Sequence, residues 1–160
     1  MKAAVVTVSD GVHAGTRDDR SGDVLEELLR EEGFDVVRRV VPDEQDEIVE
    51  AIAALAREAS LVVTTGGTGF APRDVTPEAT RRAVDRDAPG IAEAIRADAQ
   101  ARTPHALLSR GVAGLRGATL VVNLPGSSGG CRDGFAVLQP ALRHGLALAA
   151  GDTATPHRQT

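Results

Sequence analysis

The stretch LVVTTGGTGFAPRDVT, residues 61–76, decides how the rest of the chain is interpreted. Its first five residues are apolar or β-branched, which is typical of a strand covered on both faces in a parallel sheet. Three glycines within four residues follow, and backbone N–H groups there can approach an anion closely. Thr76-Pro77-Glu78 then combines a capping hydroxyl with proline at a first helical position. The stretch therefore predicts a strand, a phosphate-binding loop and a helix.

The composition indicates one globular domain. The chain has 160 residues, of which 42% are apolar and 26% are charged, as in ordinary globular domains. We expect residues 1–150 to form that domain and residues 151–160 to form a solvated tail. No apolar run is long enough to span a bilayer, and the N-terminus enters alternating apolar residues without a basic flank. These features predict a cytoplasmic protein without a membrane segment.

Charge and residue usage exclude several classes of function. The net charge of −5 and an aromatic complement of three Phe argue against binding to nucleic acid. Lys2 is the only lysine, which excludes a Walker-type phosphate lysine, a kinase-type strand lysine and an internal Schiff-base lysine. Cys131 is the only cysteine, so an internal disulfide is excluded, and we expect a small buried residue there.

Strands and helices alternate along the chain. The expected strands are residues 3–9, 34–41, 61–65 and 118–124, and residues 111–115 are a weak candidate for an edge strand or a turn. The expected helices are residues 22–32 with Ser21 as the cap, 46–58, 76–86 and 91–103. A last helix after the loop 125–130 carries Phe135, Leu138, Leu142, Leu146 and Ala149 on one face, and Pro140 marks a kink or a restart in it. This order predicts an α/β fold with a single doubly wound, mostly parallel sheet flanked by helices in three α/β/α layers.

The carboxyl ends of the parallel strands are the expected ligand edge. The loops at that edge are residues 10–20, 42–46, 66–76 and 125–130. The glycine loop, residues 66–69, matches neither GxGxxG nor GxxxxGK[ST], so it is not a dinucleotide or Walker fingerprint. By itself it is equally well explained as a tight exit from a strand. The neighbouring Arg73 and Asp74 favour a ligand site.

Asp10, Asp19, Asp43 and Asp74 lie on three of these loops. Carboxylates gathered beside a phosphate repel it unless a divalent cation lies between them, so they predict a magnesium-nucleotide site. Taken singly, each aspartate is also explained as a turn or cap residue. Asp74 fits that explanation least, because Thr76 is expected to cap the following helix.

Two further segments carry polar groups that suit an anion. Residues 125–130, PGSSGG, precede the last helix, whose N-terminus favours a second anion. Ser109-Arg110 adds a hydroxyl and a guanidinium before the last pair of strands. A plain loop and a surface role remain the alternatives for these two segments.

Together these motifs resemble the molybdenum cofactor biosynthesis proteins of the MogA/MoaB type, which include the G domain of gephyrin. The resemblance is carried by TVSD at 7–10, DRSG at 19–22, VPDE at 41–44, GGTGFAPRDVTPEAT at 66–80, LSR at 108–110 and NLPG at 123–126. It covers residues 2–150.

The resemblance implies a homotrimer, with a hexamer as the other assembly, that binds molybdopterin and adenylylates it with Mg-ATP. The adenylyl-molybdopterin product passes to a molybdenum insertase. The resemblance assigns catalysis to Asp43 and Asp74, which we also expect to hold Mg²⁺. Its nucleotide-binding residues are Gly66, Gly67, Thr68, Gly69 and Asp19. Its molybdopterin-binding residues are Ser9, Arg73, Ser109, Arg110, Pro125, Gly126 and Ser127.

Two alternative functions stay open at this point. The run PGSSGGCRDG at 125–134 is closer to the MoaB branch, and a non-catalytic molybdopterin-binding carrier would use the same scaffold. An oligomeric scaffold that senses a nucleotide would bind the nucleotide but not the pterin.

Overall fold

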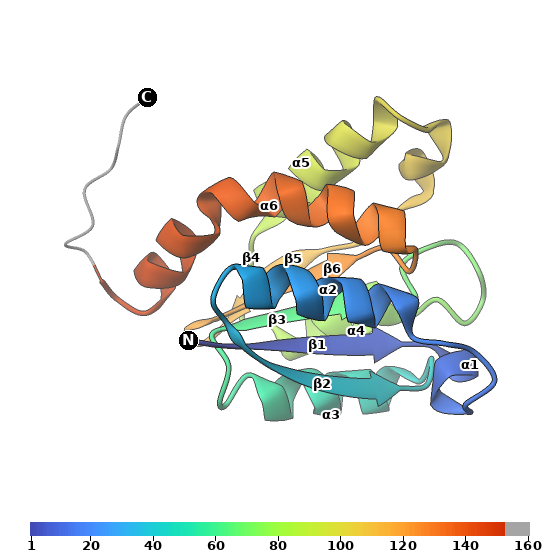
Figure 1. The fold of residues 1–160 in the computed structure, drawn as a ribbon, viewed down its shortest axis with the longest axis horizontal. Coiled ribbons are helices and arrows are strands. Elements are labelled where there is room, and N and C mark those ends of the chain that lie inside the picture. The colour runs from blue at the N-terminus through green and yellow to red at the C-terminus, as the bar shows by residue number, and fades with distance from the viewer. Residues whose placement is uncertain (153–160) are drawn as a thin grey trace.

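A computed structural model of the chain describes residues 1–152. It contains one sheet between two layers of helices (Figure 1). The strands are β1 (Lys2–Val8), β2 (Asp35–Val41), β3 (Leu61–Thr65), β4 (Arg86–Asp87), β5 (Ala113–Arg116) and β6 (Thr119–Leu124). The helices are α1 (Asp10–His13), α2 (Arg20–Glu31), α3 (Gln45–Leu55), α4 (Thr76–Ala83), α5 (Pro89–Gln100), the short 3-10 helix η1 (Pro104–Leu108) and α6 (Ser128–Ala149).

The sheet is mostly parallel, which confirms the predicted fold class. Its order is β2-β1-β3-β6-β5-β4. The pairs β1–β2, β1–β3 and β3–β6 are parallel. Strand β5 pairs antiparallel with β6 on one side and with β4 on the other. Strands β1, β3 and β6 therefore end at one edge of the sheet, and the loops that follow them meet there.

The antiparallel side of the sheet corrects one prediction. β5 is not an edge strand, because the two-residue strand β4 pairs outside it. Gly117 has a φ of 55° in the turn between β5 and β6, which folds β5 back along β6. Gly114 allows β4 to come close, since a Cβ there would lie 2.7 Å from the carbonyl oxygen of Arg86.

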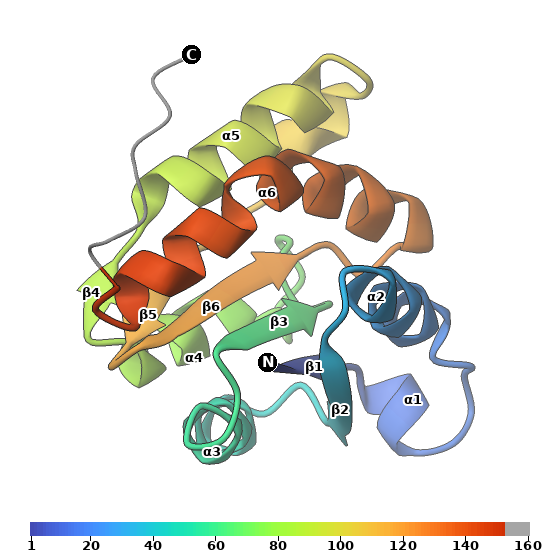
Figure 2. The same ribbon diagram turned by 60° about the vertical axis from the view of Figure 1, so that its left-hand side comes forward.

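Alternate strand residues pack on opposite faces of the sheet, as the period of a strand requires. Val5 and Val63 belong to a cluster with residues of α2, α5 and α6. Val6 and Val62 belong to a second cluster with residues of α3 and α4. Figure 2 shows these two helical layers on the two sides of the sheet.

Three helix starts differ from the prediction. Asp19, not Ser21, is the N-cap of α2, and its Oδ1 accepts from Gly22 N at 3.0 Å. Ser9 caps the short helix α1, where we expected only loop. Thr76 is the first residue of α4 rather than its cap, because its Oγ1 donates to the carbonyl oxygen of Gly66 at 2.9 Å. Asp19 and Ser9 each accept from an N–H in the first turn of their helix, whereas the Thr76 hydroxyl is used by the preceding loop.

The last helix begins earlier than predicted. α6 begins at Ser128, with Ser127 as its N-cap, so half of the expected loop 125–130 is helical. It continues past Pro140 without a restart, since proline removes only one N–H donor from a long helix that packs on the sheet. α4 ends earlier than expected, at Ala83, because Asp85 N already donates to Leu115 O of β5 at 2.7 Å.

The remaining sequence predictions concern the termini and the membrane. Of the expected tail 151–160, residues 153–160 lie outside the described part of the chain. No helix within residues 1–152 is long and apolar enough to cross a membrane.

Candidate functional site

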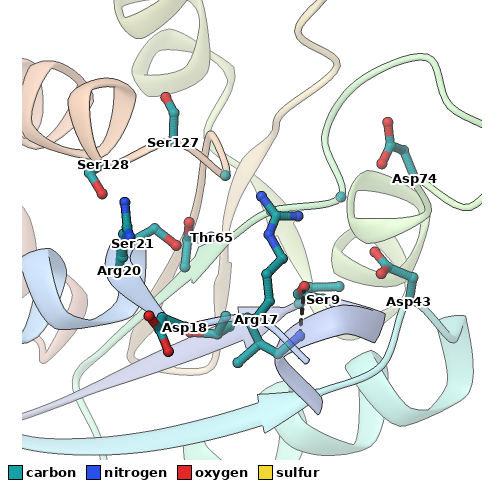
Figure 3. A pocket seen from close by; sticks show the side chains of 16 residues that line it. Ser9, Arg17, Asp18, Arg20, Ser21, Asp43, Thr65, Asp74, Ser127 and Ser128 are labelled. Atoms are coloured by element: carbon teal, nitrogen blue, oxygen red, sulfur yellow. Dashed lines mark hydrogen bonds between the residues drawn. The ribbon is translucent and has the colours of Figure 1, made fainter. Parts of the chain in front are cut away.

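A cavity of about 700 Å³ opens where β1, β3 and β6 end. Figure 3 shows it from close by. The residues that line it are Thr7, Val8, Ser9, Val12, Arg17, Asp18, Arg20, Ser21, Asp43, Thr65, Gly66, Gly67, Asp74, Gly126, Ser127 and Ser128. The cavity therefore lies at the predicted ligand edge and draws residues from all four predicted loops.

The glycine loop forms a rigid wall of this cavity. Gly66 and Gly67 have φ values of 94° and 66°, which residues with a side chain rarely adopt. A Cβ on Gly66 would collide with the carbonyl oxygen of Val8, and one on Gly67 would collide with the Thr76 hydroxyl. Thr76 also donates its backbone N–H to the carbonyl oxygen of Gly67 at 3.1 Å. The start of α4 thus holds both carbonyl groups away from the free face of the loop.

The amide groups of this loop are available to a ligand. Within residues 1–152, the backbone N–H groups of Gly67, Thr68 and Gly69 donate to no protein acceptor. Consecutive free N–H groups next to residues without Cβ suit phosphate oxygens. This geometry fits the nucleotide-binding prediction for residues 66–69, although Thr68 and Gly69 do not line the larger cavity.

Asp43 is held in place by the loop that follows β1. Its Oδ2 accepts from Asp10 N at 2.8 Å, and Asp10 Oδ1 accepts from Asp43 N at 3.0 Å. Burial raises the pKa of the Asp43 carboxyl, and the negative charges of Asp10 and Asp74 add to that rise. The Arg73 guanidinium, by contrast, holds the pKa of Asp10 below its usual value through hydrogen bonds of 2.6 and 3.1 Å.

The side chains of Asp74 and Asp43 lie on the same side of the cavity (Figure 3). Its Oδ2 accepts from Ala71 N at 2.9 Å, so Asp74 also closes a turn within its own loop. No group of three or more His, Cys, Asp or Glu side chains that could hold a metal occurs within residues 1–152. Two carboxylates nevertheless fit Mg²⁺, which keeps several waters and completes its shell with substrate phosphates.

The cavity brings together seven of the predicted site residues: Ser9, Asp43, Gly66, Gly67, Asp74, Gly126 and Ser127. A second, smaller cavity of about 390 Å³ adjoins it through Ser127. Three more predicted residues line this second cavity: Thr68, Ser109 and Pro125. The two cavities are separated by the segment around Pro125, so they offer adjacent places for a nucleotide and a second substrate.

Four predicted site residues line neither cavity: Asp19, Gly69, Arg73 and Arg110. Asp19 caps α2 and also accepts from Thr7 Oγ1 at 2.8 Å and from the Arg38 guanidinium at 2.5 Å. Arg73 bridges Asp10 and Glu44. Arg110 donates to the backbone carbonyls of Gly69 and Asp74. Their side chains therefore hold the walls of the site in this structure.

Sequence reasoning missed several residues that line the larger cavity, among them Arg17, Asp18, Arg20, Thr65 and Ser128. Arg17, Asp18 and Arg20 lie in the loop after β1 and at the start of α2, a region already assigned to the ligand edge. The sequence signal that could have identified them is their position next to Asp19. The family motif points instead to Asp19, whose side chain accepts from Thr7 and Arg38 rather than facing the cavity.

Cys131 is buried, as predicted. Its Sγ donates to the carbonyl oxygen of Pro125 at 3.1 Å, and burial raises the pKa of the thiol to about 11. A thiol with that pKa stays protonated at neutral pH and is a poor nucleophile.

Comparison with known proteins identifies a family that shares this architecture. The family described as "Probable molybdopterin binding domain" matches residues 4–144. The chain is 36% identical over 153 residues to the molybdopterin adenylyltransferase of Helicobacter pylori strain J99, covering 92% of this chain and 87% of that protein. It is 38% identical over 152 residues to the molybdenum cofactor synthesis protein cinnamon of Drosophila melanogaster. There the match covers 92% of this chain and 25% of that protein, so the chain spans about a quarter of that longer relative.

A solved structure agrees with the sequence comparison. The crystal structure of the molybdopterin biosynthesis enzyme MoaB from Thermus thermophilus superposes with a TM-score of 0.88 at 44% sequence identity. The superposition covers 94% of this chain and 96% of that one. The fold is therefore shared over nearly the whole chain.

Proposed function

Because the chain belongs to the molybdopterin-binding domain family of molybdenum cofactor biosynthesis, we propose that it transfers the adenylyl group of ATP to molybdopterin. The observation that carries this proposal is the pairing, in one cavity, of two carboxylates with Gly66 and Gly67 of the glycine loop, where the Gly67 N–H donates to no acceptor within residues 1–152. Such a site suits a magnesium-bound polyphosphate. On the family resemblance we also propose Mg²⁺ as the metal, a homotrimer as the assembly and a molybdenum insertase as the recipient of the product.

In the proposed reaction an oxygen of the terminal phosphate of molybdopterin attacks the α-phosphorus of ATP. A new P–O bond forms, and the bond between the α-phosphorus and the oxygen that bridges to the β-phosphorus breaks. The electron pair of that bond leaves with pyrophosphate. The products are adenylyl-molybdopterin and pyrophosphate, and no covalent intermediate with the protein is needed. This suits a site in which the only thiol, Cys131, is buried and protonated.

The protein would contribute alignment and charge stabilisation. The free N–H groups of residues 67–69 would donate to phosphate oxygens, as pre-oriented donors do where negative charge develops. Asp43 and Asp74 would hold Mg²⁺, which when bound neutralises phosphate charge. The hydrogen bonds between Asp10 and Asp43 would keep the Asp43 carboxylate directed at the metal position. Orienting two bound substrates accounts for a large part of such a rate acceleration.

The test is a pyrophosphate-release assay with molybdopterin, ATP and magnesium. Asp74→Asn keeps an oxygen that can accept from Ala71 N, so the loop should stay folded and molybdopterin should still bind. The loss of a carboxylate charge should lower adenylyl transfer by about 100- to 1000-fold. Asp35→Asn is the matched control, since Asp35 is exposed at the opposite end of the sheet, and it should retain full activity.

The same assay separates the proposal from its alternatives. Full activity of the Asp74→Asn protein would contradict the proposed role of Asp74. Tight binding of molybdopterin by the native chain without pyrophosphate release would instead indicate a carrier. Binding of ATP without affinity for molybdopterin would indicate a nucleotide-sensing scaffold.

A further inference from the structure

Two guanidinium groups in the larger cavity have no partner in the protein. Within residues 1–152, the side chains of Arg17 and Arg20 take part in no hydrogen bond or ion pair, although both residues line the cavity. Arg38, Arg73 and Arg110 behave differently, since each binds at least one carboxylate. Arg17 and Arg20 are thus the cations of this region that stay available to an outside anion.

The local structure directs Arg17 into the cavity. Its side chain packs against Gly11, where a Cβ would lie only 3.1 Å from the Arg17 Cδ. Figure 3 shows the Arg17 side chain standing between the carboxylates of Asp43 and Asp74 on one side and Ser127 on the other. A larger residue at position 11 would occupy the space that the Arg17 stem uses.

Arg20 stands where helix chemistry disfavours a cation. It is the first residue of α2, and the positive end of the helix dipole repels a positive side chain there. The N-terminus of the 22-residue helix α6, with Ser127 and Ser128, lies on the same side of the cavity (Figure 3). Its first N–H groups have no partner within the helix. The side of the cavity away from Asp43 and Asp74 therefore offers helix N–H donors and the Arg20 guanidinium, with the Asp18 carboxylate beside them (Figure 3).

The charge balance of the cavity favours a polyanion only together with a cation. Two arginines and three aspartates, Asp18, Asp43 and Asp74, line it, which gives a formal charge of +2 − 3 = −1. A divalent cation beside Asp43 and Asp74 changes this sum to +1. The guanidiniums of Arg17, in the middle of the cavity, and of Arg20, farther from Asp43 and Asp74, then remain free for an anion (Figure 3).

We propose that Arg17 and Arg20 bind the β- and γ-phosphates of the nucleoside triphosphate, and then the pyrophosphate that leaves. This inference rests on the proposed function for the identity of the nucleotide. The guanidiniums donate to the terminal phosphate oxygens, while the glycine loop would bind the α-phosphate and Asp43 and Asp74 would hold the metal. Negative charge grows on the leaving pyrophosphate during the reaction, so the two arginines stabilise the departing group more than the bound substrate.

Calorimetric titration with pyrophosphate, tripolyphosphate and AMP, each with magnesium, tests this placement. Arg17→Ala and Arg20→Ala should each weaken pyrophosphate and tripolyphosphate binding about tenfold, and the double variant more. AMP binding should change less than twofold, because its single phosphate belongs at the glycine loop. Arg57→Ala is the matched control, since Arg57 is exposed, unpaired within residues 1–152 and remote from both cavities, and it should bind all three ligands as the native chain does.

The results test the inference and the proposed function separately. Equal pyrophosphate affinity of the native chain and the double variant would overturn the inference, and so would a failure of the native chain to bind pyrophosphate. Pyrophosphate binding that depends on Arg17 and Arg20, without any adenylyl transfer, would sustain the inference and contradict the proposed function. A double variant that is active with an unchanged KM for ATP would contradict the inference and sustain the proposed function. Arg17→Lys, which keeps the charge, should recover part of the affinity.

Discussion

Arg110 shows how a single residue joins segments that are distant in the chain. Its Nε donates to the carbonyl oxygen of Gly69 at 2.7 Å, and a terminal nitrogen donates to that of Asp74 at 2.6 Å. Its other terminal nitrogen binds Glu78 in α4. The guanidinium thereby holds both ends of the loop that carries Asp74. Its planar set of donors suits this role, which a lysine could not fill.

Glu78 makes the stability of this clamp depend on pH. Burial by itself would raise the pKa of Glu78, but the hydrogen bond from Arg110 and nearby positive charge outweigh it, so the pKa is lowered. A lowered pKa means that the ionised carboxylate stabilises the folded state above the ordinary value of 4.5. That contribution is lost as the pH falls through the folded-state pKa.

Glu78→Gln should therefore lower the free energy of unfolding at pH 7 by less than about 1 kcal/mol, since the pair is partly exposed. The difference from the native chain should shrink when the pH is lowered below 4.5. Urea unfolding at several pH values measures this. Glu50→Gln is the control, because Glu50 is exposed on α3 and unpaired within residues 1–152. A destabilisation by Glu78→Gln that grows on acidification would contradict the lowered pKa of Glu78.

At the scale of elements, β3, the glycine loop and α4 form one unit. The strand is fully buried, and the loop turns sharply through two glycines with positive φ. The first residue of α4, Thr76, donates to the carbonyl oxygens of both glycines. The short helix α4 therefore begins where the loop requires a donor, and the loop conformation and the helix start stabilise each other.

Gly66→Ala should break this unit. The methyl group would meet the carbonyl oxygen of Val8, and the positive φ would strain any side chain. We expect a loss of about 1 to 3 kcal/mol in the free energy of unfolding and weaker ATP binding by the remaining folded protein. Gly145→Ala is the matched control, because Gly145 lies within α6 with open space around it. That substitution should stabilise the protein by about 0.5 to 1 kcal/mol. Calorimetric melting and ATP titration measure both, and an unchanged Gly66→Ala protein would contradict the strain argument.

At the scale of the whole molecule, two helical layers share one sheet. Ile52 of α3 and Leu142 of α6 are fully buried in the separate clusters on its two faces. Both clusters include residues of β1 and β3, so neither layer can lose its packing without exposing the sheet that supports the other. This arrangement favours a single cooperative unfolding transition.

Ile52→Ala and Leu142→Ala should each lower the free energy of unfolding by about 2 to 5 kcal/mol. Both variants should still unfold in one step. Scanning calorimetry tests this without relying on Trp or Tyr, which the chain lacks, through the agreement of calorimetric and van't Hoff enthalpies. Two separate transitions in either variant would contradict the shared-sheet argument.

The sequence by itself determined the parallel core and its ligand edge. The apolar runs of β1, β3 and β6 could only be buried strands, and three glycines after β3 required a turn with close backbone approach. These signals are local, because they depend on hydrophobic periodicity and on the conformational freedom of glycine. They placed Asp43, Asp74 and the glycine loop correctly at one edge.

The tertiary structure alone decided which polar side chains face the cavity. Asp19 and Arg110 have the chemistry of ligands, but Thr7, Arg38 and the carbonyls of the glycine loop lie close enough to bind them. Arg17 and Arg20 received no such partner and stay free within residues 1–152. The sequence specifies which groups can bind charge, whereas their partners come from distant segments. A polar side chain supports the walls of the site when the fold gives it a protein partner, and it is available to a ligand when the fold gives it none.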